Sequence, residues 1–453
     1  MEIAIIGAGL MGEYTAKALY NKAEKINICS SKPREMLEKM FQGDKYRFTN
    51  HPREAVITSD VDIFCVPTDV IYDKMLEALP FCKKGAIISG QTSRKKPEAD
   101  AFDKYTGNHP ESKLELVTIH TLCNPATSNA KKEILGIIRH NSSDSAFDRA
   151  FELYGDMSEH IEIFDNILNH DLSIANTQTD TSRNELSTTS TFAKRKSFPW
   201  LNGVYSNPID EIKLALAVRV ATLPPHVYRG IQFNCVHGKE LVQRAMEIEE
   251  DLYGMIICGY KEEYKKRVLS AKKTLFGNKN IEPILTDKFL SQIKDTDIKG
   301  VLDNSHYSLI QNAVYRAETG LGLYEDIRTT TPMYTALITL IDYLFNKEGE
   351  LERAIEAPFM DTPEGKKLRR DDYAFHNEIT AWSLALLHNS TTLYNKKHKE
   401  MIDNLNDPAV RDRVKTYVDR SKDYVEICRQ ALMESGRVKL KKFDSKHYSY
   451  MLA

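Results

Sequence analysis

Length, composition and charge exclude several classes of protein. The 453 residues are too many for one ordinary hydrophobic core, so two or three domains are expected. Hydrophobic residues make up 42% of the chain and charged residues 28%, which is typical of a soluble globular protein. The formal net charge of −2 creates no field that would attract nucleic acid or an anionic membrane. The chain has no run of about 18 apolar residues, so no membrane span is predicted.

Cysteine usage and the start of the chain indicate the compartment. The seven cysteines are scattered and odd in number, without a C-x-x-C pair. This pattern favours free thiols in a reducing cytosol over a disulfide framework or a zinc site, and no metal is predicted. The first residues read directly as a strand, with no basic region or cleavage site, so no secretory signal is visible. We therefore expect a cytoplasmic protein.

The first third of the chain alternates short apolar runs with helical patterns. Such alternation predicts βαβ units and a parallel sheet. Helices are expected at residues 13–23 and 70–79, among others. The predicted strands are residues 2–7, 25–30, 46–49, 61–67, 85–90, 114–120, 134–140 and, as the last, 161–164.

The pattern changes at about residue 166. The later segments are long and amphipathic, as in residues 238–276 and 331–359, with apolar residues recurring at intervals of three and four. The remainder therefore reads as predominantly helical. We predict an α/β Rossmann-type domain at residues 1–165, followed by a large all-α domain at residues 166–453.

A glycine-rich turn follows the first predicted strand. Gly7, Gly9 and Gly12 stand in the G-x-G-x-x-G spacing, with Leu10 and Met11 between them, and a helical pattern continues at once. A strand before and a helix after are what the dinucleotide fingerprint requires. The first glycine permits the turn, the second lets the backbone approach a pyrophosphate, and the third allows close helix packing. The alternative is a glycine-rich turn without a ligand.

The end of the second predicted strand discriminates between cofactors. NAD sites place a carboxylate there for the ribose 2′-hydroxyl, whereas this chain has Ser30, Ser31, Lys32 and Arg34. Hydroxyls and cations suit a 2′-phosphate, so NADP is predicted over NAD; the alternative is an ordinary basic surface loop.

The fourth predicted strand ends in a short turn segment that could also meet the cofactor. Val66, Pro67 and Thr68 follow that strand at the edge of the sheet where such folds bind ligands. They either pack beside the nicotinamide ribose or form a turn only.

Two further strand ends carry candidate catalytic residues. Ser93 comes just after the fifth predicted strand, and His120 ends the sixth. A neutral imidazole at this edge could accept a proton from a substrate hydroxyl as hydride leaves, and Ser93 could orient its ring or bond the same hydroxyl. The alternative is a structural histidine. In the helical half, Arg219 lies within an apolar run and needs an anionic partner, either a structural carboxylate or a substrate carboxylate.

These motifs together resemble the prephenate dehydrogenase family, particularly its long fungal-type members. Their shared order over roughly 350 residues is what makes the resemblance specific. The matching segments are the glycine loop, GQTS at residues 90–93, His120 with Pro125 downstream, HDxxxAxTQ from His170 to Gln178, R(x)6HVYxG from Arg219 to Gly230, NSHxSL from Asn304 to Leu309, and residues 331–345.

The resemblance implies a Rossmann-type domain, a helical domain that forms a homodimer, and a role in tyrosine biosynthesis. The implied reaction is NADP-dependent oxidative decarboxylation of prephenate to 4-hydroxyphenylpyruvate. By motif position, His120 bonds the ring C4 hydroxyl and Ser93 is its hydrogen-bonding neighbour. Arg219 holds a substrate carboxylate, and Gln178 and Ser182 belong to the substrate site.

One segment departs from the family. Related sequences carry a histidine where this chain has Ser182, and the surrounding residues Asp180, Arg183, Asn184 and Glu185 are unusually polar. Either these residues bind the same substrate differently, or the pocket accepts a modified substrate such as arogenate, whose ammonium would favour an acidic residue. A non-catalytic NADP-binding relative is the third alternative.

Overall fold

The computed structural model describes residues 1–124, 129–195, 207–233, 237–277, 281–293, 305–324, 331–360 and 370–438. Pro125 and Asn304, which belong to two of the motifs above, lie outside these ranges. The described part of the chain divides into two compact units, Met1–Ile174 and Ala175–Lys439 up to its last described residue. No helix in the described ranges is long and apolar enough to cross a membrane.

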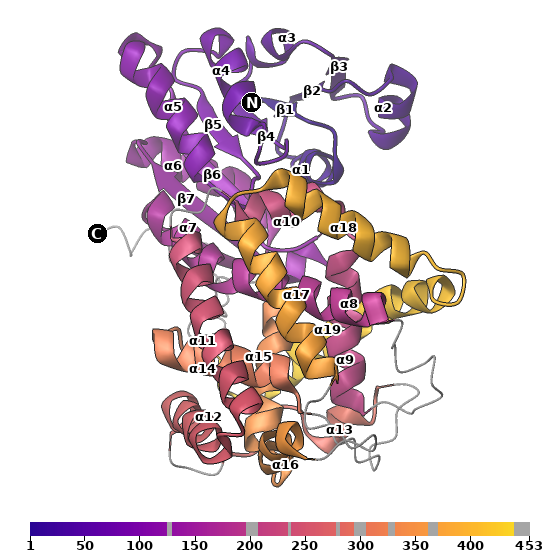
Figure 1. Cartoon of the computed structure of the whole chain (residues 1–453). Coiled ribbons are helices and arrows are strands. Elements are labelled where there is room, and N and C mark those ends of the chain that lie inside the picture. Colours follow the sequence, from indigo (N-terminus) through magenta and orange to yellow (C-terminus); the bar gives the residue numbers. More distant parts are fainter. Residues whose placement is uncertain are drawn as a thin grey trace. The chain divides into compact units, whose positions relative to one another are not determined.

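The first unit is built around an eight-stranded sheet with the order β3-β2-β1-β4-β5-β6-β7-β8 (Figure 1). Each strand overlaps one of the predicted segments, and the predicted Rossmann-type fold is confirmed. The strands are β1 (Glu2–Ile6), β2 (Lys25–Cys29), β3 (Tyr46–Thr49), β4 (Val61–Phe64), β5 (Ile87–Gly90), β6 (Glu115–Thr121), β7 (Ile134–His140) and β8 (His160–Phe164).

One strand pair departs from the expected parallel sheet. β7 runs antiparallel to β6, with His120 paired to Gly136, while all other neighbouring strands are parallel. A parallel neighbour needs a crossover connection, usually a helix. The described residues between β6 and β7 contain only a short 3₁₀ turn, so the chain returns in the opposite direction.

Helices cover both faces of this sheet. Residues of α1, α2 and α6 form one apolar core with alternate residues of the strands, such as Ile3 and Ile5. Residues of α3, α4, α5 and α7 form a second core with the residues between, such as Ala4 and Ile6. The helices are α1 (Leu10–Ala18), α2 (Arg34–Met40), α3 (Pro52–Val56), α4 (Ile71–Ala78), α5 (Lys96–Asn108), α6 (Asp144–Tyr154) and α7 (Ile167–Ile174).

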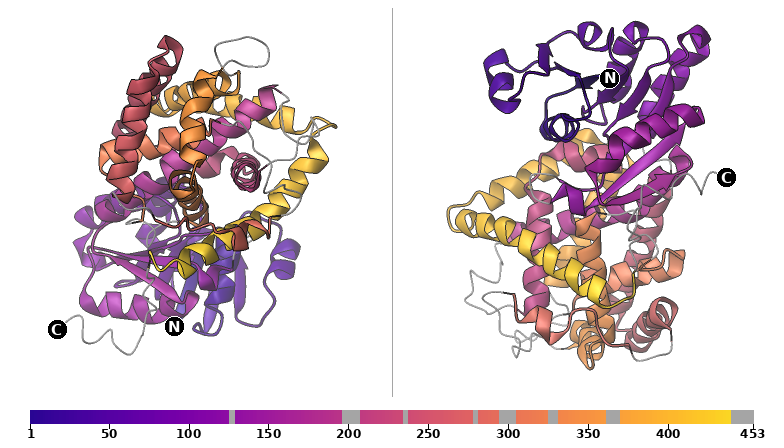
Figure 2. Two further views of the ribbon diagram at one scale, coloured as in Figure 1. Left: turned by 90° about the horizontal axis from the view of Figure 1, so that it is seen from below. Right: turned by 180° about the vertical axis from the view of Figure 1, so that it is seen from behind.

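The second unit is helical in its described ranges, as predicted. Its central helices α8 and α9 pack together, and α19 runs along both α9 and α15 although these segments are far apart in the chain (Figure 2). The helices are α8 (Asp180–Arg195), α9 (Pro208–Ala221), α10 (Pro225–Gln232), α11 (Gly238–Cys258), α12 (Lys261–Phe276), α13 (Asp287–Leu290), α14 (Tyr307–Thr319), α15 (Pro332–Asn346), α16 (Glu350–Glu356), α17 (Arg370–Leu387), α18 (Thr391–Leu405) and α19 (Arg411–Glu434).

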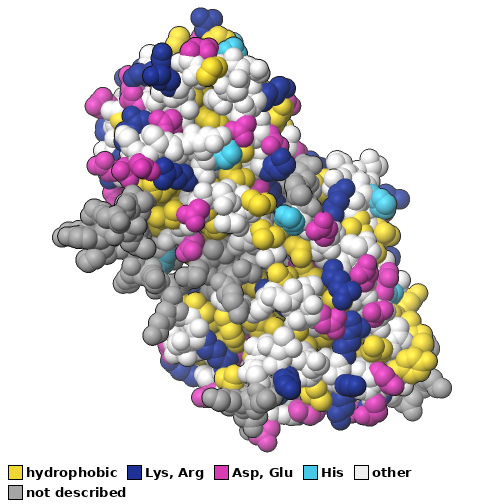
Figure 3. Space-filling view, turned by 90° about the vertical axis from the view of Figure 1, so that its left-hand side faces the viewer, with side chains coloured by type: hydrophobic (Ala, Val, Ile, Leu, Met, Phe, Trp, Pro, Cys, Tyr) yellow, Lys and Arg dark blue, Asp and Glu magenta, His cyan; other side chains and the backbone are white. Residues whose placement is uncertain are grey.

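The surface shows no single-sign field on the face drawn in Figure 3. Positive and negative side chains are interspersed there, in keeping with the small net charge. The described residues also contain no group of three or more His, Cys, Asp and Glu side chains that could hold a metal ion.

Candidate active site

The glycine loop lies where the strand order of the sheet reverses. β1 is flanked by β2 and β4, so successive connections leave on opposite sides and open a crevice at the carboxyl ends of the strands. Gly7 donates its amide to the Cys29 carbonyl at the end of β2, at 2.9 Å. Two features require glycine at this position: its φ of +107°, and the Cys65 carbonyl oxygen, which would lie 2.5 Å from a Cβ on Gly7.

The other two glycines differ in what a side chain would meet. A Cβ on Gly12 would lie 1.9 Å from the Gly7 carbonyl oxygen, so close packing of α1 on the loop requires a glycine there. A Cβ on Gly9 would meet no atom within 4 Å. Gly9 is also the N-cap of α1 and makes no side-chain capping bond. Open space in front of helix amides fits the pyrophosphate of a dinucleotide, with Leu10 and Met11 opening the helix.

The residues after β2 are polar or basic, and no carboxylate occurs between residues 30 and 34. The Ser30 hydroxyl accepts a hydrogen bond from the Lys32 amide at 3.2 Å, which shapes the turn. Ser31 and Arg34 are exposed, and Lys32 is half-buried. Arg34 pairs with Glu38 at 2.8 Å, an exposed contact that a bound anion could replace at little cost.

The segment after β4 borders the glycine loop. The Cys65 amide donates to the Ile6 carbonyl at 2.8 Å, which places the two strand ends side by side. Val66 and Thr68 are half-buried and Pro67 is exposed. These side chains therefore lie at the crevice where the sequence predicts the cofactor.

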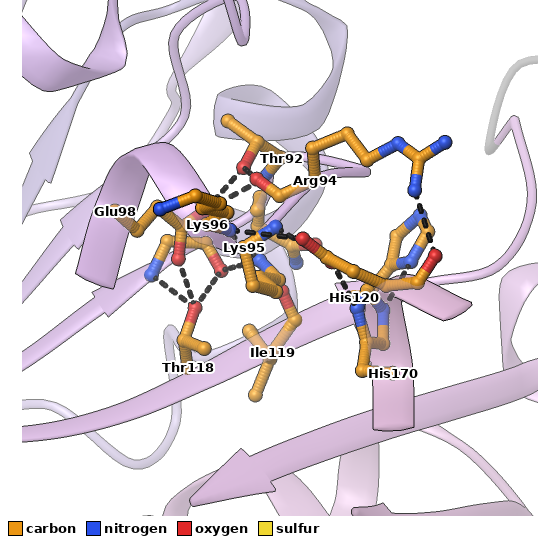
Figure 4. A network of polar contacts seen from close by, with 12 residues as sticks. Thr92, Arg94, Lys95, Lys96, Glu98, Thr118, Ile119, His120 and His170 are labelled. Atoms are coloured by element: carbon orange, nitrogen blue, oxygen red, sulfur yellow. Dashed lines mark hydrogen bonds and ion pairs between the residues drawn. The ribbon is translucent and has the colours of Figure 1, made fainter. Parts of the chain in front are cut away.

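His120 is the penultimate residue of β6 and is buried, with 4% of its surface exposed. Its Nδ1 lies 3.0 Å from Nε2 of His170 in α7, and Nδ1 of His170 lies 2.9 Å from a carboxylate oxygen of Asp171 (Figure 4). Burial lowers the pKa of His120 well below 6.5, and the nearby His170, Lys95 and Arg94 lower it further. His120 is therefore neutral at pH 7.

Ser93 lies in the turn between β5 and α5 and is half-buried. The ring contact that the sequence assigned to Ser93 is made by His170 instead, since His170 occupies Nδ1 of His120. A contact between Ser93 and the substrate stays a prediction.

A buried ion pair supports this edge of the sheet. The Lys95 ammonium donates to Glu98 at 3.0 Å and to the carbonyls of Gly90 and Ile119 at 3.1 and 2.7 Å (Figure 4). Neither side chain of the pair is exposed to solvent. The pair joins the start of α5 to the ends of β5 and β6.

The sequence reasoning did not single out His170 or Asp171. The available signal was the HD dipeptide of the HDxxxAxTQ motif, which the resemblance had already included. The dipeptide alone does not show that its histidine meets a residue 50 positions earlier in the chain.

The remaining candidates, Gln178, Ser182 and Arg219, belong to the second unit. Gln178 is in a single π-helical turn, Ala175–Thr179, and such turns are frequent at functional sites. The Ser182 hydroxyl bonds to the Gln178 carbonyl at 2.6 Å and receives a bond from Gln232 at 2.9 Å. Arg219 lies in α9 with 9% exposure, close enough to Tyr228 for its charge to lower the pKa of that phenol against the effect of burial, which raises it to about 12.

The polar departure in α8 is almost entirely buried. Asp180 pairs with Arg183 at 2.6 Å and accepts a bond from Asn312 of α14 at 2.5 Å. These two charges therefore satisfy each other inside the helical unit. Glu185 is different: one of its oxygens is buried without a hydrogen-bond partner in the described residues, and burial raises its pKa to about 8, against the effect of Lys213.

Comparisons with known proteins place the chain. Residues 180–415, more than half of the chain, match the family model of the 6-phosphogluconate dehydrogenase C-terminal domain. The chain belongs to this family. Residues 2–109 match the NAD binding domain of 6-phosphogluconate dehydrogenase, which agrees with the glycine loop.

Two fungal relatives of this family member are similar over most of their length. The first, from Schizosaccharomyces pombe, is named "Probable prephenate dehydrogenase [NADP(+)]"; it is 26% identical over 88% of this chain and 92% of its own. The second, from Saccharomyces cerevisiae, is named "Prephenate dehydrogenase [NADP(+)]" and is 26% identical over 93% of this chain and 95% of its own. A solved Synechocystis arogenate dehydrogenase is 13% identical with a TM-score of 0.46, over 59% of this chain and 95% of its own. The predicted resemblance to fungal prephenate dehydrogenases is confirmed.

Proposed function

We propose that this chain is an NADP-dependent prephenate dehydrogenase, which converts prephenate to 4-hydroxyphenylpyruvate and CO2. The observation that carries the proposal is the buried, neutral His120 at the carboxyl edge of the dinucleotide sheet. Similarity to the two fungal relatives over about nine-tenths of the chain supports the same reaction.

The glycine loop holds the cofactor in this proposal, and NADP+ supplies the hydride acceptor. His120 bonds the C4 hydroxyl of the ring through Nε2 and takes up positive charge as the C4 hydride leaves with its electron pair. The ring carboxylate departs as CO2, and the electrons of its bond complete the aromatic ring. Alignment and proton assistance are what the protein must provide. Arg219, Gln178 and Ser182 are proposed to bind the rest of the substrate.

The choice of NADP follows from the residues after β2. A carboxylate there would repel a 2′-phosphate, and this loop offers Ser30, Ser31, Lys32 and Arg34 instead. We therefore propose that the enzyme uses NADP in preference to NAD.

Prephenate is favoured over arogenate by the state of the acidic residues in α8. An ammonium group needs an anion, but Asp180 is already paired with Arg183 and Asn312. Glu185, with a pKa of about 8, is largely protonated at neutral pH. The keto acid meets neither obstacle. We further propose that the enzyme is cytoplasmic and forms a homodimer through its helical unit.

The test is a cofactor-reduction assay on the purified chain. NADP reduction is followed by absorbance with prephenate, then with arogenate, and each reaction is repeated with NAD. We expect turnover with prephenate and NADP. Absence of reduction with either substrate, despite measurable NADP binding, would favour the non-catalytic relative.

Variants assign the roles. His120→Asn should lower kcat by about 10²- to 10⁴-fold, the usual contribution of a general base. Arg219→Lys should chiefly raise KM. His109→Asn, an exposed histidine of the same unit, is the matched control and should change neither constant. An unchanged kcat for His120→Asn would remove this histidine from the mechanism.

A further inference from the structure

His170 and Asp171 form a hydrogen-bonded chain that ends on His120. The two contacts are 2.9 Å from Asp171 to His170 and 3.0 Å from His170 to His120 (Figure 4 shows the second). His170 is fully buried, and the Asp171 side chain is 14% exposed. Both residues come from the first two turns of α7, and all three lie in the first unit.

The direction of each hydrogen bond follows from the carboxylate. An ionised carboxylate can only accept, so Nδ1 of His170 donates to Asp171. In a neutral imidazole the other nitrogen is then an acceptor, so Nε2 of His170 accepts from Nδ1–H of His120. Neutral His120 therefore carries its proton on Nδ1, and Nε2 presents a lone pair.

Asp171 is held in place and kept ionised. Its two oxygens accept the backbone amides of Lys95 and Lys96 at 2.9 and 3.0 Å, where α5 begins. Burial raises the pKa of its carboxyl, but the bond from His170, the charges of His170 and Arg94, and the Lys95 amide outweigh burial, and the net pKa lies below 3.8. The start of a helix also favours a negative charge.

We propose that His170 and Asp171 are positioning residues that hold His120 in the tautomer able to accept the substrate's hydroxyl proton. This inference rests on the proposed function. When Nε2 of His120 takes up a proton, the Nδ1 proton can pass to Nε2 of His170. The N–H bond on His120 then breaks as one forms on His170, and the positive charge comes to lie beside Asp171.

The charged groups around the pair agree with this assignment. From the start of α5, Arg94 and Lys95 lower the pKa of His120, after burial and together with His170. Burial is also the main cause of the lowered pKa of His170, with Asp171 and Glu98 acting in the opposite direction and Lys95 in the same one. Lys95 is itself paired with Glu98. Asp171 is the anion in direct contact with the two rings.

The kinetic test uses three variants and one control. His170→Phe keeps a ring against Phe164, whose centroid lies 5.0 Å away, but removes the acceptor. Asp171→Asn keeps the shape but removes the charge, and His170→Gln restores an acceptor. We expect His170→Phe and Asp171→Asn to lower kcat by about 10²- to 10⁴-fold with KM and NADP affinity little changed, and His170→Gln to recover part of the loss. Asp103→Asn, in an exposed carboxylate–histidine pair of the same unit, should leave kcat unchanged.

A second readout needs no substrate. In protein labelled with ¹⁵N-histidine, the shifts of His120 should show Nδ1 protonated and Nε2 unprotonated at pH 7.5. In His170→Phe this should become a mixture of the two tautomers. A purely structural role would not change the tautomer.

The two readouts separate the inference from the proposed function. If the wild-type chain oxidises prephenate while both variants keep full kcat and the same His120 tautomer, the positioning role is wrong and the function stands. If the wild-type chain does not turn over, the function fails, and the tautomer of His120 in His170→Phe still decides the inference. A His120 protonated on Nε2 in the wild-type chain would overturn it directly.

Discussion

Replacing Lys95 by methionine should destabilise the first unit strongly, because the Lys95–Glu98 pair is completely buried. Methionine keeps most of the side-chain volume but lacks the ammonium. The three hydrogen bonds to Glu98, Gly90 and Ile119 are then lost together. The Glu98 carboxylate stays buried without its cation.

The magnitude follows from this loss. Removing one partner of a buried ion pair costs about 3–5 kcal/mol, since the remaining charge is uncompensated. Glu98 keeps the Thr118 hydroxyl at 2.5 Å and the Thr92 amide at 3.2 Å, which places Lys95→Met toward the lower end of that range. The isosteric Glu98→Gln removes the charge. The double variant should therefore be less destabilised than the sum of the single variants by about 2–3 kcal/mol.

The assay has to report on the first unit alone. Both tryptophans, Trp200 and Trp382, come after its last residue, so tryptophan fluorescence does not follow its unfolding. Hydrogen exchange measured on peptides that cover β5 and β6 does. A loss of about 3 kcal/mol should speed the exchange of their slowest amides by about two orders of magnitude.

The neighbouring pair provides the control. Lys96 and Asp100 lie 2.7 Å apart on the same helix, but each side chain is 49% exposed. Lys96→Met should cost about 0.5 kcal/mol or less. If Lys95→Met proves as mild as Lys96→Met, the buried pair does not stabilise this edge of the sheet as reasoned.

Three further predictions concern single residues. Gly12→Ala should prevent folding of the first unit, because its Cβ would lie 1.9 Å from a backbone oxygen, whereas Gly9→Ala should keep the fold and weaken NADP binding; circular dichroism and calorimetric titration distinguish these outcomes. Gly254→Ala should stabilise the second unit by about 0.5–1 kcal/mol in a urea titration followed by fluorescence, since it lies inside α11 with no atom within 4 Å of the new Cβ. The folded-state pKa of His120 lies below 6.5, so the unfolded chain binds more protons and stability should fall below about pH 6.5, by up to about 1.4 kcal/mol per pH unit for this group. Exchange rates of β6 amides, corrected for intrinsic pH dependence, should show a smaller loss in His120→Asn; an equal loss would contradict the assignment.

Local patterns in the sequence were sufficient for most of the fold. The period-two and period-three-to-four repeats of apolar residues are set by how strands and helices bury one face, so each predicted strand overlaps an observed one. The direction of β7 was not accessible in this way. It depends on how the chain returns to the sheet, and a strand reads the same in either orientation.

The polar residues of α8 show where sequence reasoning stops. Asp180, Arg183 and Glu185 were candidates for selecting the substrate because the segment looked too polar for a core. In the structure Asp180 and Arg183 are neutralised by each other, with Asn312 supplied by a helix 132 residues further on. Only Glu185 remains with a buried oxygen that has no partner in the described residues.

The sequence by itself determined the glycine loop, the absence of a carboxylate after β2, and the placement of His120 near a strand end, because each depends on neighbouring residues alone. Tertiary structure decided which nitrogen of His120 faces outward. That choice depends on His170 and Asp171, which lie 50 and 51 positions away and meet His120 only when α7 packs against the sheet. A hydrogen bond has a direction only when both of its partners are in place, and the chain brings these partners together only by folding.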